Sequence, residues 1–316
     1  MASPVNLVIF AARENIATLI TSLSCALHAV PEESRVDVLV NGNHELADQI
    51  NAWICENTVI EAKQCQVWYI SVADKGNAWN QHIHTIWQQD LDAVYIDGYV
   101  RISRDAIAAL SKTLADNPSA LGTSGLPTVG ASARTLQQTM RKEGGFHGNL
   151  CAIKASALAQ LRGRGIRIPL GMYRVDSIMG AFLSFGLDNT VHPWDPFRYL
   201  PTTTDALWEC DEKKWYRWQD IVAWLNRRKR QIRGAFENAA VKYYLADSKR
   251  LPETLPDNVH ELVLTWSRSN PNSANALIKQ SVRHREAMQF FSDYVPPAPA
   301  DCIASRISDC QTSLSK

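Results

Sequence analysis

Short apolar runs alternate with amphipathic stretches along the first part of the chain. Four apolar runs predict strands, at 5–10, 36–41, 65–70 and 93–97. Four stretches with helical spacing lie between or after them, at 15–30, 45–56, 76–89 and 103–116. Continuous apolar strands that alternate with amphipathic helices are typical of a parallel sheet covered on both faces. The pattern therefore predicts an α/β fold, in which a ligand binds beyond the carboxyl ends of the strands.

The middle of the chain is less regular. Residues 144–161 indicate a Gly-rich turn, a strand and a helix, and residues 173–186 indicate a helix that opens near Asp176. A strand followed by a Pro-rich loop is expected at 191–201.

The last third predicts helices. A long helical region is expected at 212–246, where Trp215, Trp218 and Trp224 accompany a dense run of arginines. A linker is expected at 251–258 and helices at 259–268 and 273–291. The tail contains the sequence PPAPA at 296–300 and is expected to be loosely ordered.

Two of the predicted strands end in a polar residue. Asn41 closes the run at 36–41 and Asp97 closes the run at 93–97. Because the carboxyl ends of parallel strands meet at one edge of a sheet, both side chains are expected to point into one crevice.

Composition excludes several classes of protein. The chain has 316 residues, of which 46% are hydrophobic and 21% charged, enough for one large α/β domain with a C-terminal elaboration. A net charge of +1 gives no overall attraction to nucleic acid. The first residues read as neither a signal peptide nor a membrane span, and no window of about 18 residues is uninterruptedly apolar. Seven scattered cysteines without a CxxC pair favour a reduced, cytoplasmic chain without structural zinc.

Seven motifs in a fixed order carry a resemblance to a known family. They are FAAREN at 10–15, LVNGN at 39–43, KGNAWN at 75–80, YIDGYV at 95–100, GNLCAIKASAL at 148–158, YRVDSIMGAF at 173–182 and RRKRQIRG at 227–234. Their order and spacing resemble the family 2 glycosyltransferases, which share the GT-A fold. The resemblance implies a mostly parallel, Rossmann-like sheet flanked by helices at 1–236, which binds the nucleotide-sugar and carries catalysis. Residues 237–316 would form a helical C-terminal extension and the loosely ordered tail.

The chain departs from the family pattern at several positions. Asn41 replaces the aspartate that ends the second strand, and Tyr99 replaces the second acid of the D-x-D motif. Val175 stands where a glutamate precedes Asp176. In the last motif Gln231 replaces tryptophan and Arg227 replaces glutamine.

The resemblance implies transfer of a sugar from a nucleoside diphosphate, with inversion at the sugar carbon. Asp97 is expected to serve the diphosphate through a Mg²⁺ or Mn²⁺ ion. Because Tyr99 removes the second acid, three outcomes stay open. In the first outcome His192 completes the metal site, in the second basic side chains replace the metal, and in the third donor binding is lost. Asp97 could instead merely cap the following turn.

Asp176 is the candidate general base, although the same position suits a helix N-cap. Glu14 and Asn41 are expected to meet the nucleoside, because a carboxylate accepts from ribose hydroxyls and an amide both donates and accepts. Glu14 could instead be an acid favoured by the helix dipole. The change from Asp to Asn at position 41 predicts a base preference other than uracil.

The family pattern adds further donor-binding candidates in Lys75, Gly76 and Asn80, at a helix start suited to anions. His147 and Gly148 lie on a Gly-rich turn and are candidates for contact with the acceptor or the sugar. His82 and His84 are two apart on a predicted helix, point to opposite sides and are not expected to bind metal.

The basic run at 226–234 has three interpretations. Arg230 clamps the diphosphate, or the run is a solvated helix face, or it joins the tryptophans as a membrane-surface patch. The leading hypothesis is a glycosyltransferase, either free in the cytoplasm or at the inner face of the membrane, that acts on a carbohydrate or lipid-linked acceptor in surface polysaccharide or glycoconjugate synthesis. The alternatives are a degenerate, non-catalytic GT-A protein that serves as a binding or partner subunit, and a nucleotidyltransferase.

Overall fold

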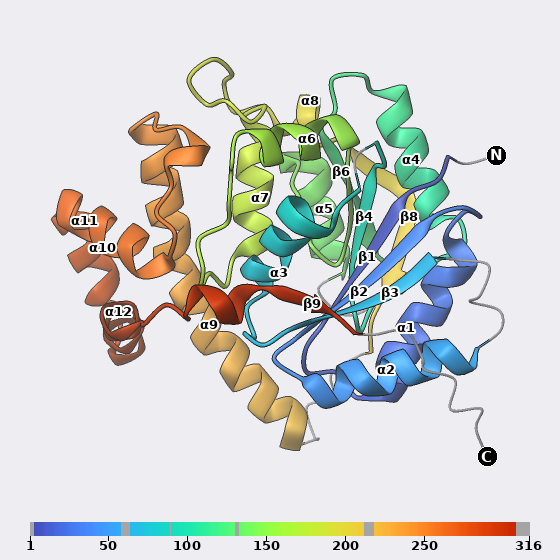
Figure 1. The fold of residues 1–316 in the computed structure, drawn as a ribbon. Coiled ribbons are helices and arrows are strands. Elements are labelled where there is room, and N and C mark those ends of the chain that lie inside the picture. The colour runs from blue at the N-terminus through green and yellow to red at the C-terminus, as the bar shows by residue number, and fades with distance from the viewer. Residues whose placement is uncertain (1–2, 58–63, 89, 130–132, 212–217, 308–316) are drawn as a thin grey trace.

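The computed structural model describes residues 3–57, 64–88, 90–129, 133–211 and 218–307. Within them the chain forms one sheet with the strand order β5-β8-β6-β7-β4-β1-β2-β3-β9 and helices on both faces (Figure 1). This arrangement confirms the predicted α/β class with a mostly parallel sheet.

The centre of the sheet is made of four parallel strands. They are β1 (Asn6–Ala11), β2 (Arg35–Asn41), β3 (Gln64–Ile70) and β4 (Ala93–Asp97). Every residue of β1, β2 and β4 is buried, as expected for strands covered on both faces. In β1, Phe10 lies opposite both Leu39 and Asp97, so the carboxyl ends of the three strands meet at one edge.

Polar caps fix the turns at this edge. The helices α1 (Ile16–Ala29), α2 (His44–Glu56) and α3 (Lys75–Gln81) follow Asn15, Asn43 and Asp74. Each cap side chain accepts a hydrogen bond from an otherwise unpaired amide of the first helical turn. This bond sets where the helix begins. The helix predicted at 76–89 is α3 continued by a short π-helix, η2 (His82–Ile86). The helix predicted at 103–116 is α4 (Ala106–Asp116).

The middle of the chain adds three elements that match the prediction and two that were not predicted. The matches are β7 (Leu150–Ile153), α6 (Ala155–Gly163) and α7 (Val175–Ser184). The unpredicted elements are β6 (Gly122–Pro127) and α5 (Ala133–Glu143). The sequence of β6, GTSGLP, is small and polar, and it becomes a strand because it pairs with β7 and β8.

The strand predicted at 191–201 is wrong. That segment forms a loop and the short helix α8 (Pro196–Tyr199), which Asp195 caps by accepting from the Arg198 amide at 3.0 Å. Pro193 and Pro196 have no amide hydrogen for a strand ladder, which explains the difference. The strand of this region is β8 (Thr202–Glu209), which pairs with β6 and with β5 (Arg101–Ile102).

The C-terminal region is helical, as predicted. The long helix α9 (Trp218–Lys242) continues as the π-helix η3 (Tyr243–Asp247), and the predicted linker contains the 3-10 helix η4 (Pro252–Thr254). Three helices follow, α10 (Val259–Ser269), α11 (Pro271–Ile278) and α12 (Val282–Asp293). The boundary predicted after residue 236 falls inside α9. The part of the long helical prediction at 212–217, with Trp215, lies outside the described residues.

The prediction of a loosely ordered tail is wrong up to residue 307. The 3-10 helix η5 (Pro299–Cys302) leads into β9 (Ala304–Arg306), which returns from the helical extension and pairs antiparallel with β3 (Figure 1). The Ile307 amide donates to the Val67 carbonyl at 2.9 Å, and Asn77 Nδ2 donates to the Cys302 carbonyl at 2.8 Å. Backbone pairing therefore orders a segment of weak apolar pattern. Residues 308–316 lie outside the described part of the chain.

Two apolar clusters cover the two faces of the sheet. One contains α1, α2 and α4, with Leu19, Ile50 and Leu110 at its centre. The other joins α3, α6 and α7 to the C-terminal helices, so that Phe236 and Phe291 belong to the same core as the helices next to the sheet. The C-terminal extension therefore shares a core with the rest of the chain.

The described cysteines differ in state. Cys25, Cys65, Cys151 and Cys302 are free thiols, whereas Cys55 is disulfide-bonded. The expectation of a fully reduced chain therefore does not hold at Cys55. Among the described helices, none combines the length and apolar character needed to cross a bilayer.

Candidate active site

A cleft of about 1010 Å³ lies at the carboxyl ends of β1, β2 and β4. Small-molecule sites typically have volumes of about 300–1,000 Å³, so this cleft has room for a nucleotide and a sugar. Eight of the eleven predicted site residues line it: Glu14, Asn41, Lys75, Asp97, His147, Gly148, Asp176 and Arg230. The fold therefore brings most of the predicted site together.

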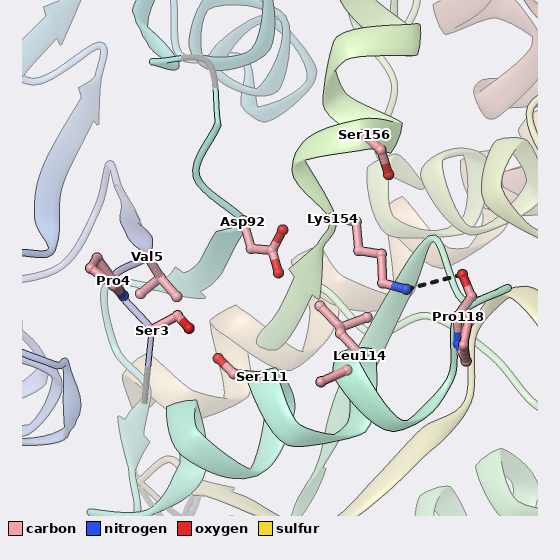
Figure 2. Close-up of a pocket in the computed structure, with 10 residues that line it drawn as sticks. Ser3, Pro4, Val5, Asp92, Ser111, Leu114, Pro118, Lys154 and Ser156 are labelled. Atoms are coloured by element: carbon pink, nitrogen blue, oxygen red, sulfur yellow. Dashed lines mark hydrogen bonds between the residues drawn. The ribbon is translucent and has the colours of Figure 1, made fainter. Parts of the chain in front are cut away.

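A smaller pocket of about 320 Å³ lies at the opposite ends of β1 and β4 (Figure 2). Val5 precedes β1 and Asp92 precedes β4, so this pocket marks the amino edge of the sheet. Lys154 lies across it and donates to the Asn117 and Pro118 carbonyls at 2.9 and 3.2 Å. The Lys154 ammonium is therefore turned toward backbone carbonyls.

Asp97 ends β4 and is 8% exposed. Its Oδ1 accepts a hydrogen bond and ion pair from Lys75 Nζ, and its Oδ2 accepts from the Tyr99 hydroxyl at 3.0 Å. Burial and the charge of Asp97 raise the pKa of Tyr99, so its hydroxyl keeps the proton that it donates. Both carboxylate oxygens of Asp97 are thus engaged by the protein itself.

Lys75 is the first residue of α3 and lines the cleft. Burial lowers the pKa of Lys75, but the charge and hydrogen bond of Asp97, with the charge of Asp176, outweigh burial and raise it. A Cβ added to Gly148 would lie 3.5 Å from Lys75 Nζ and 3.3 Å from Asp176 Cβ. Lys75 and Asp176 therefore flank the same small space, which exists because residue 148 has no side chain.

Asp176 lies in the first turn of α7, and the N-cap of that helix is Arg174. The N-cap alternative for Asp176 is therefore wrong. Its Oδ1 accepts from the Ser177 amide at 3.1 Å, and the side chain lines the cleft.

Glu237 of α9 holds the start of α7 in place. Its carboxylate accepts from the Tyr173 amide at 3.1 Å and from the Arg174 amide at 2.8 Å. Burial raises the pKa of Glu237 to about 7. Glu237 is 1% exposed and so fixes the backbone that precedes Asp176.

Asn41 and Glu14 lie at the first two strand ends. Asn41 is 4% exposed, its Nδ2 donates to the Ala11 carbonyl at 3.3 Å, and its Oδ1 has no partner among the described residues. Glu14 Oε2 accepts from the Ala12 and Arg13 amides at 2.7 and 2.9 Å, which shapes the loop after β1. Asn41 thus offers a ligand an unused acceptor.

One face of α9 and the start of α7 bring guanidinium groups to the cleft. They are Arg174, Arg227, Arg230 and Arg233. Nε of Arg174 and Nε of Arg230 are buried without a hydrogen-bond partner in the described structure. Burial lowers the pKa of Arg233, and the charge of Glu237 opposes this effect. These groups make one wall of the cleft suited to an anion.

His147 lines the cleft and stacks near Trp208, with ring centroids 5.3 Å apart. Its Nδ1 accepts from the Asn149 amide at 3.3 Å. Burial lowers the pKa of His147, against the opposing charges of Asp176 and Asp97, so the imidazole is neutral near pH 7.

Three predicted site residues do not line the cleft. His192 packs near Tyr199, with ring centroids 5.8 Å apart, and is not a partner of Asp97 in a metal site. Asn80 is buried, with Oδ1 and Nδ2 both bonded to the Ile168 backbone at 2.9 and 2.8 Å. Gly76 is buried where an added Cβ would lie 3.0 Å from Ile168, so this glycine serves helix packing.

His82 and His84 make hydrogen bonds within the fold. His82 is fully buried between Tyr95 Oη at 2.9 Å and Asn6 Oδ1 at 2.8 Å. Burial, with Arg35 and Arg162 nearby, lowers the pKa of His82 to about 3. His84 Nε2 contacts the Ile166 carbonyl at 2.9 Å.

Sequence reasoning missed several residues that line the cleft, namely Tyr173, Arg174, Trp208, Arg233, Glu237, Phe290 and Tyr294. A helical spacing could have found two of them. Arg227, Arg230, Arg233 and Glu237 recur at intervals of three or four and share one face of α9. Tyr173 and Arg174 lie in the motif at 173–182, whereas Trp208, Phe290 and Tyr294 come from segments that carry no strand-end or motif signal.

The fold, with its cleft at the carboxyl edge of the sheet, is similar to that of solved glycosyltransferase structures. No protein-family profile and no curated protein matches the sequence. Among solved structures, the chain is similar to the mannosyltransferase PcManGT from Pyrobaculum calidifontis in complex with GDP-Man and Mn²⁺. The TM-score is 0.56 at 14% identity, over 92% of this chain and 85% of that one.

The chain is also similar to S. aureus TarS 1-349 in complex with UDP-GlcNAc. This TM-score is 0.50 at 12% identity, over 92% of this chain and 80% of that one. A second structure of TarS 1-349 gives a TM-score of 0.50 at 12% identity, over 89% and 77% of the two chains. At these identities the likeness defines the fold, and the chemistry is argued from the residues of the cleft.

Proposed function

We propose that this protein transfers a sugar from a nucleoside-diphosphate sugar to an acceptor hydroxyl. The proposal is carried by one observation, that Lys75, paired with Asp97, and Asp176 flank one space in a cleft at the carboxyl edge of the sheet. A cation for the departing diphosphate and a base for the acceptor are the two charged groups that such a transfer needs. The solved structures of similar fold bind GDP-Man and UDP-GlcNAc, which supports this class of donor.

Asp176 serves as the general base. The acceptor oxygen forms a bond to the anomeric carbon while the hydroxyl proton passes to the Asp176 carboxylate. The bond between that carbon and the diphosphate oxygen breaks, and its electron pair leaves with the diphosphate. Attack from the side opposite the leaving group inverts the configuration of the sugar carbon. The arginine wall of α9 and the Gly-rich turn at His147 restrict water around the sugar.

Asn41 and Glu14 bind the nucleoside in this proposal. The unpaired Oδ1 of Asn41 accepts an N–H of the base, and the Glu14 carboxylate lies where ribose hydroxyls can donate to it. An amide at position 41 in place of a carboxylate leaves the base subsite without a negative charge.

The acceptor is a carbohydrate or a lipid-linked sugar, with a place in surface polysaccharide or glycoconjugate synthesis on the cytoplasmic side of a membrane. The first half of α9 supports this context. Trp224 is 54% exposed, and the Arg228 guanidinium lies 5.7 Å from its ring centroid. Exposed aromatic and basic side chains on one helix suit the surface of an anionic bilayer.

A non-catalytic binding protein is the second candidate, and Tyr99 favours it. Tyr99 has a hydroxyl where the D-x-D motif has its second acid, and Asp97 already forms an ion pair with Lys75. Such a protein would bind a nucleotide-sugar and release no nucleoside diphosphate.

A donor screen by thermal shift tests the proposed class. Because a ligand that binds only the folded state raises the melting temperature, one nucleoside-diphosphate sugar and its free diphosphate are expected to stabilise the protein. Stabilisation by a nucleoside triphosphate, with release of pyrophosphate, would point to nucleotidyl transfer. A panel in which no nucleotide shifts the melting temperature would overturn the proposal.

A further inference from the structure

The neighbourhood of Asp97 does not fit a divalent cation. Mg²⁺ takes oxygen ligands in an octahedral shell and is usually held by one or two carboxylates together with phosphates. Lys75 Nζ already lies on one oxygen of Asp97, and the Tyr99 hydroxyl lies on the other at 3.0 Å. A cation in contact with Asp97 would lie beside an ammonium of the same sign, which repels it.

Asp176 and His147 line the same cleft as Asp97, but these side chains do not form a metal-binding cluster in the described part of the chain. The described residues contain no group of three or more His, Cys, Asp or Glu side chains able to hold a metal ion. The residue two positions after Asp97 is a tyrosine, and His192 lies outside the cleft. The structure of the similar mannosyltransferase holds Mn²⁺, whereas the described residues of this chain offer no such cluster of protein ligands.

We propose that the Lys75 ammonium takes the place of the divalent cation and meets the diphosphate of the donor directly. This inference rests on the proposed function and adds that donor binding is independent of metal. Asp97 then acts as a positioning residue, which holds the ammonium in the cleft instead of ligating a metal. Tyr99 fixes the second oxygen of Asp97. Both Tyr99 and Lys75 then hold Asp97 in a site that uses an ammonium in place of a metal ion.

The geometry around Lys75 supports this role. An ammonium has three hydrogens, and Asp97 uses one, so others remain for phosphate oxygens. The space next to Nζ is open because Gly148 has no side chain. Arg230 and Arg174 line the same cleft with Nε atoms that have no partner in the described structure, and they supply the further positive charge that a diphosphate needs.

Lys75 contributes to the reaction by stabilising charge. As the bond from the anomeric carbon to the diphosphate breaks, the leaving oxygen gains negative charge, and the ammonium hydrogen bond to it strengthens. Lys75 keeps its proton throughout, so the proton balance stays between the acceptor and Asp176.

Calorimetric titration with GDP, UDP, ADP and CDP, in a chelator or in saturating Mn²⁺, tests the inference. We expect at least one diphosphate to bind with the same Kd in both conditions. Binding only with Mn²⁺ would overturn the role of Lys75 and leave the proposed function standing. If no diphosphate binds in either condition, both the inference and the proposed function fail.

Substitutions of Lys75 provide the second measurement. Because a hydrogen bond to a charged group contributes roughly 1.5–3 kcal/mol, Lys75→Met is expected to weaken diphosphate binding about 10- to 100-fold. Binding of the free nucleoside should be unchanged, which also reports that the variant is folded. Lys112→Met, which removes an exposed lysine paired with Asp116 on α4, is the charge-matched control and should bind as the wild type does.

A combined variant, Lys75→Met with Tyr99→Asp, removes the ammonium and restores a second acid. Electron paramagnetic resonance of Mn²⁺ is expected to detect tighter Mn²⁺ binding to this variant in the presence of diphosphate than to the wild type. Wild-type protein that takes up Mn²⁺ as tightly as the combined variant would contradict the inference.

Discussion

Gly148 keeps open the space between the cation and the base of the proposed reaction. An added Cβ would meet Asp176 Cβ at 3.3 Å and Lys75 Nζ at 3.5 Å, although the glycine backbone angles suit an alanine. Gly148→Ala is therefore expected to fold normally and to lower the rate of sugar transfer at least about tenfold, since small displacements of reacting groups have large effects. The rate of nucleoside diphosphate release and the melting temperature are the measurements.

Gly163→Ala at the end of α6 is the matched control, because nothing lies within 4 Å of the Cβ that it adds. Transfer by Gly148→Ala at the rate of this control would show that the reaction does not use the space between Lys75 and Asp176.

Glu237 links stability to pH. Burial raises its pKa from 4.5 to about 7, so the folded protein holds this proton more tightly than the unfolded chain does. The protonated Glu237 therefore contributes to the free energy of unfolding in full below pH 4.5, and this contribution is lost as the pH rises through 7. At 1.36 kcal/mol per pKa unit the loss is about 3 kcal/mol. Glu237→Gln is expected to remove this part of the pH dependence in unfolding experiments.

Glu32→Gln changes an exposed glutamate and controls for the loss of an acid. It should keep the wild-type slope of stability against pH. If Glu237→Gln keeps the wild-type slope of stability against pH, Glu237 does not take up a proton in this range and the account of its burial is wrong.

Sequence reasoning at the residue scale succeeded where a side chain ends a strand. Asn41 and Asp97 close buried apolar runs, and a parallel sheet brings such ends to one edge. It failed at His192, which has no strand-end position, and at Glu237, whose contact with the start of α7 spans 63 residues of sequence. The pairing of Asp97 with Lys75 is likewise a tertiary contact, which the local sequence around either residue does not predict.

The helix α9 has two parts with different surroundings. Arg230, Arg233 and Glu237 of its second part line the cleft, whereas Val222, Trp224 and Leu225 of its first part are exposed. We expect the first part to bind anionic vesicles, through the apolar side chains and the attraction of Arg228 and its neighbours to lipid headgroups. Figure 1 shows α9 extending beyond the sheet and its covering helices.

Co-sedimentation with phosphatidylglycerol vesicles tests this expectation, with phosphatidylcholine vesicles for comparison. Trp224→Ala is expected to weaken binding to the anionic vesicles about threefold or more, because it removes a large apolar side chain that the bilayer would bury. Trp194→Ala is the control, because Trp194 is 55% exposed on the segment before α8. Equal binding by both variants would exclude α9 as the contact.

At the element scale, the sequence predicts the buried strands and their helices and misses elements that depend on a partner. The strands β1 and β4 are apolar at every interior position, β2 is apolar at every interior position except Asp37, and all three are recognisable in isolation. The strand β6 is small and polar, and β9 has three residues, two of them exposed. Pairing with neighbours already in the sheet decides the structure of such segments, and a local pattern does not record that pairing.

For the molecule as a whole, the C-terminal extension completes the site. Phe290, Tyr294 and Pro297 line the cleft together with the strand-end residues. The extension also shares one apolar core with the helices next to the sheet, and β9 extends the sheet beyond β3. The expected separation into a domain at 1–236 and an extension therefore divides residues that build one cleft.

The most direct measurement of the central claim compares donor binding with turnover in Asp176→Asn. The donor is the nucleotide-sugar found by thermal shift, binding is measured by calorimetry, and turnover is the release of nucleoside diphosphate. Because a general base contributes about 10²- to 10⁴-fold, turnover is expected to fall at least about a hundredfold while the Kd of the donor stays within about twofold. Asp205→Asn, at an exposed position on β8, should change neither quantity. Undiminished turnover in Asp176→Asn, with donor binding intact, would contradict the account.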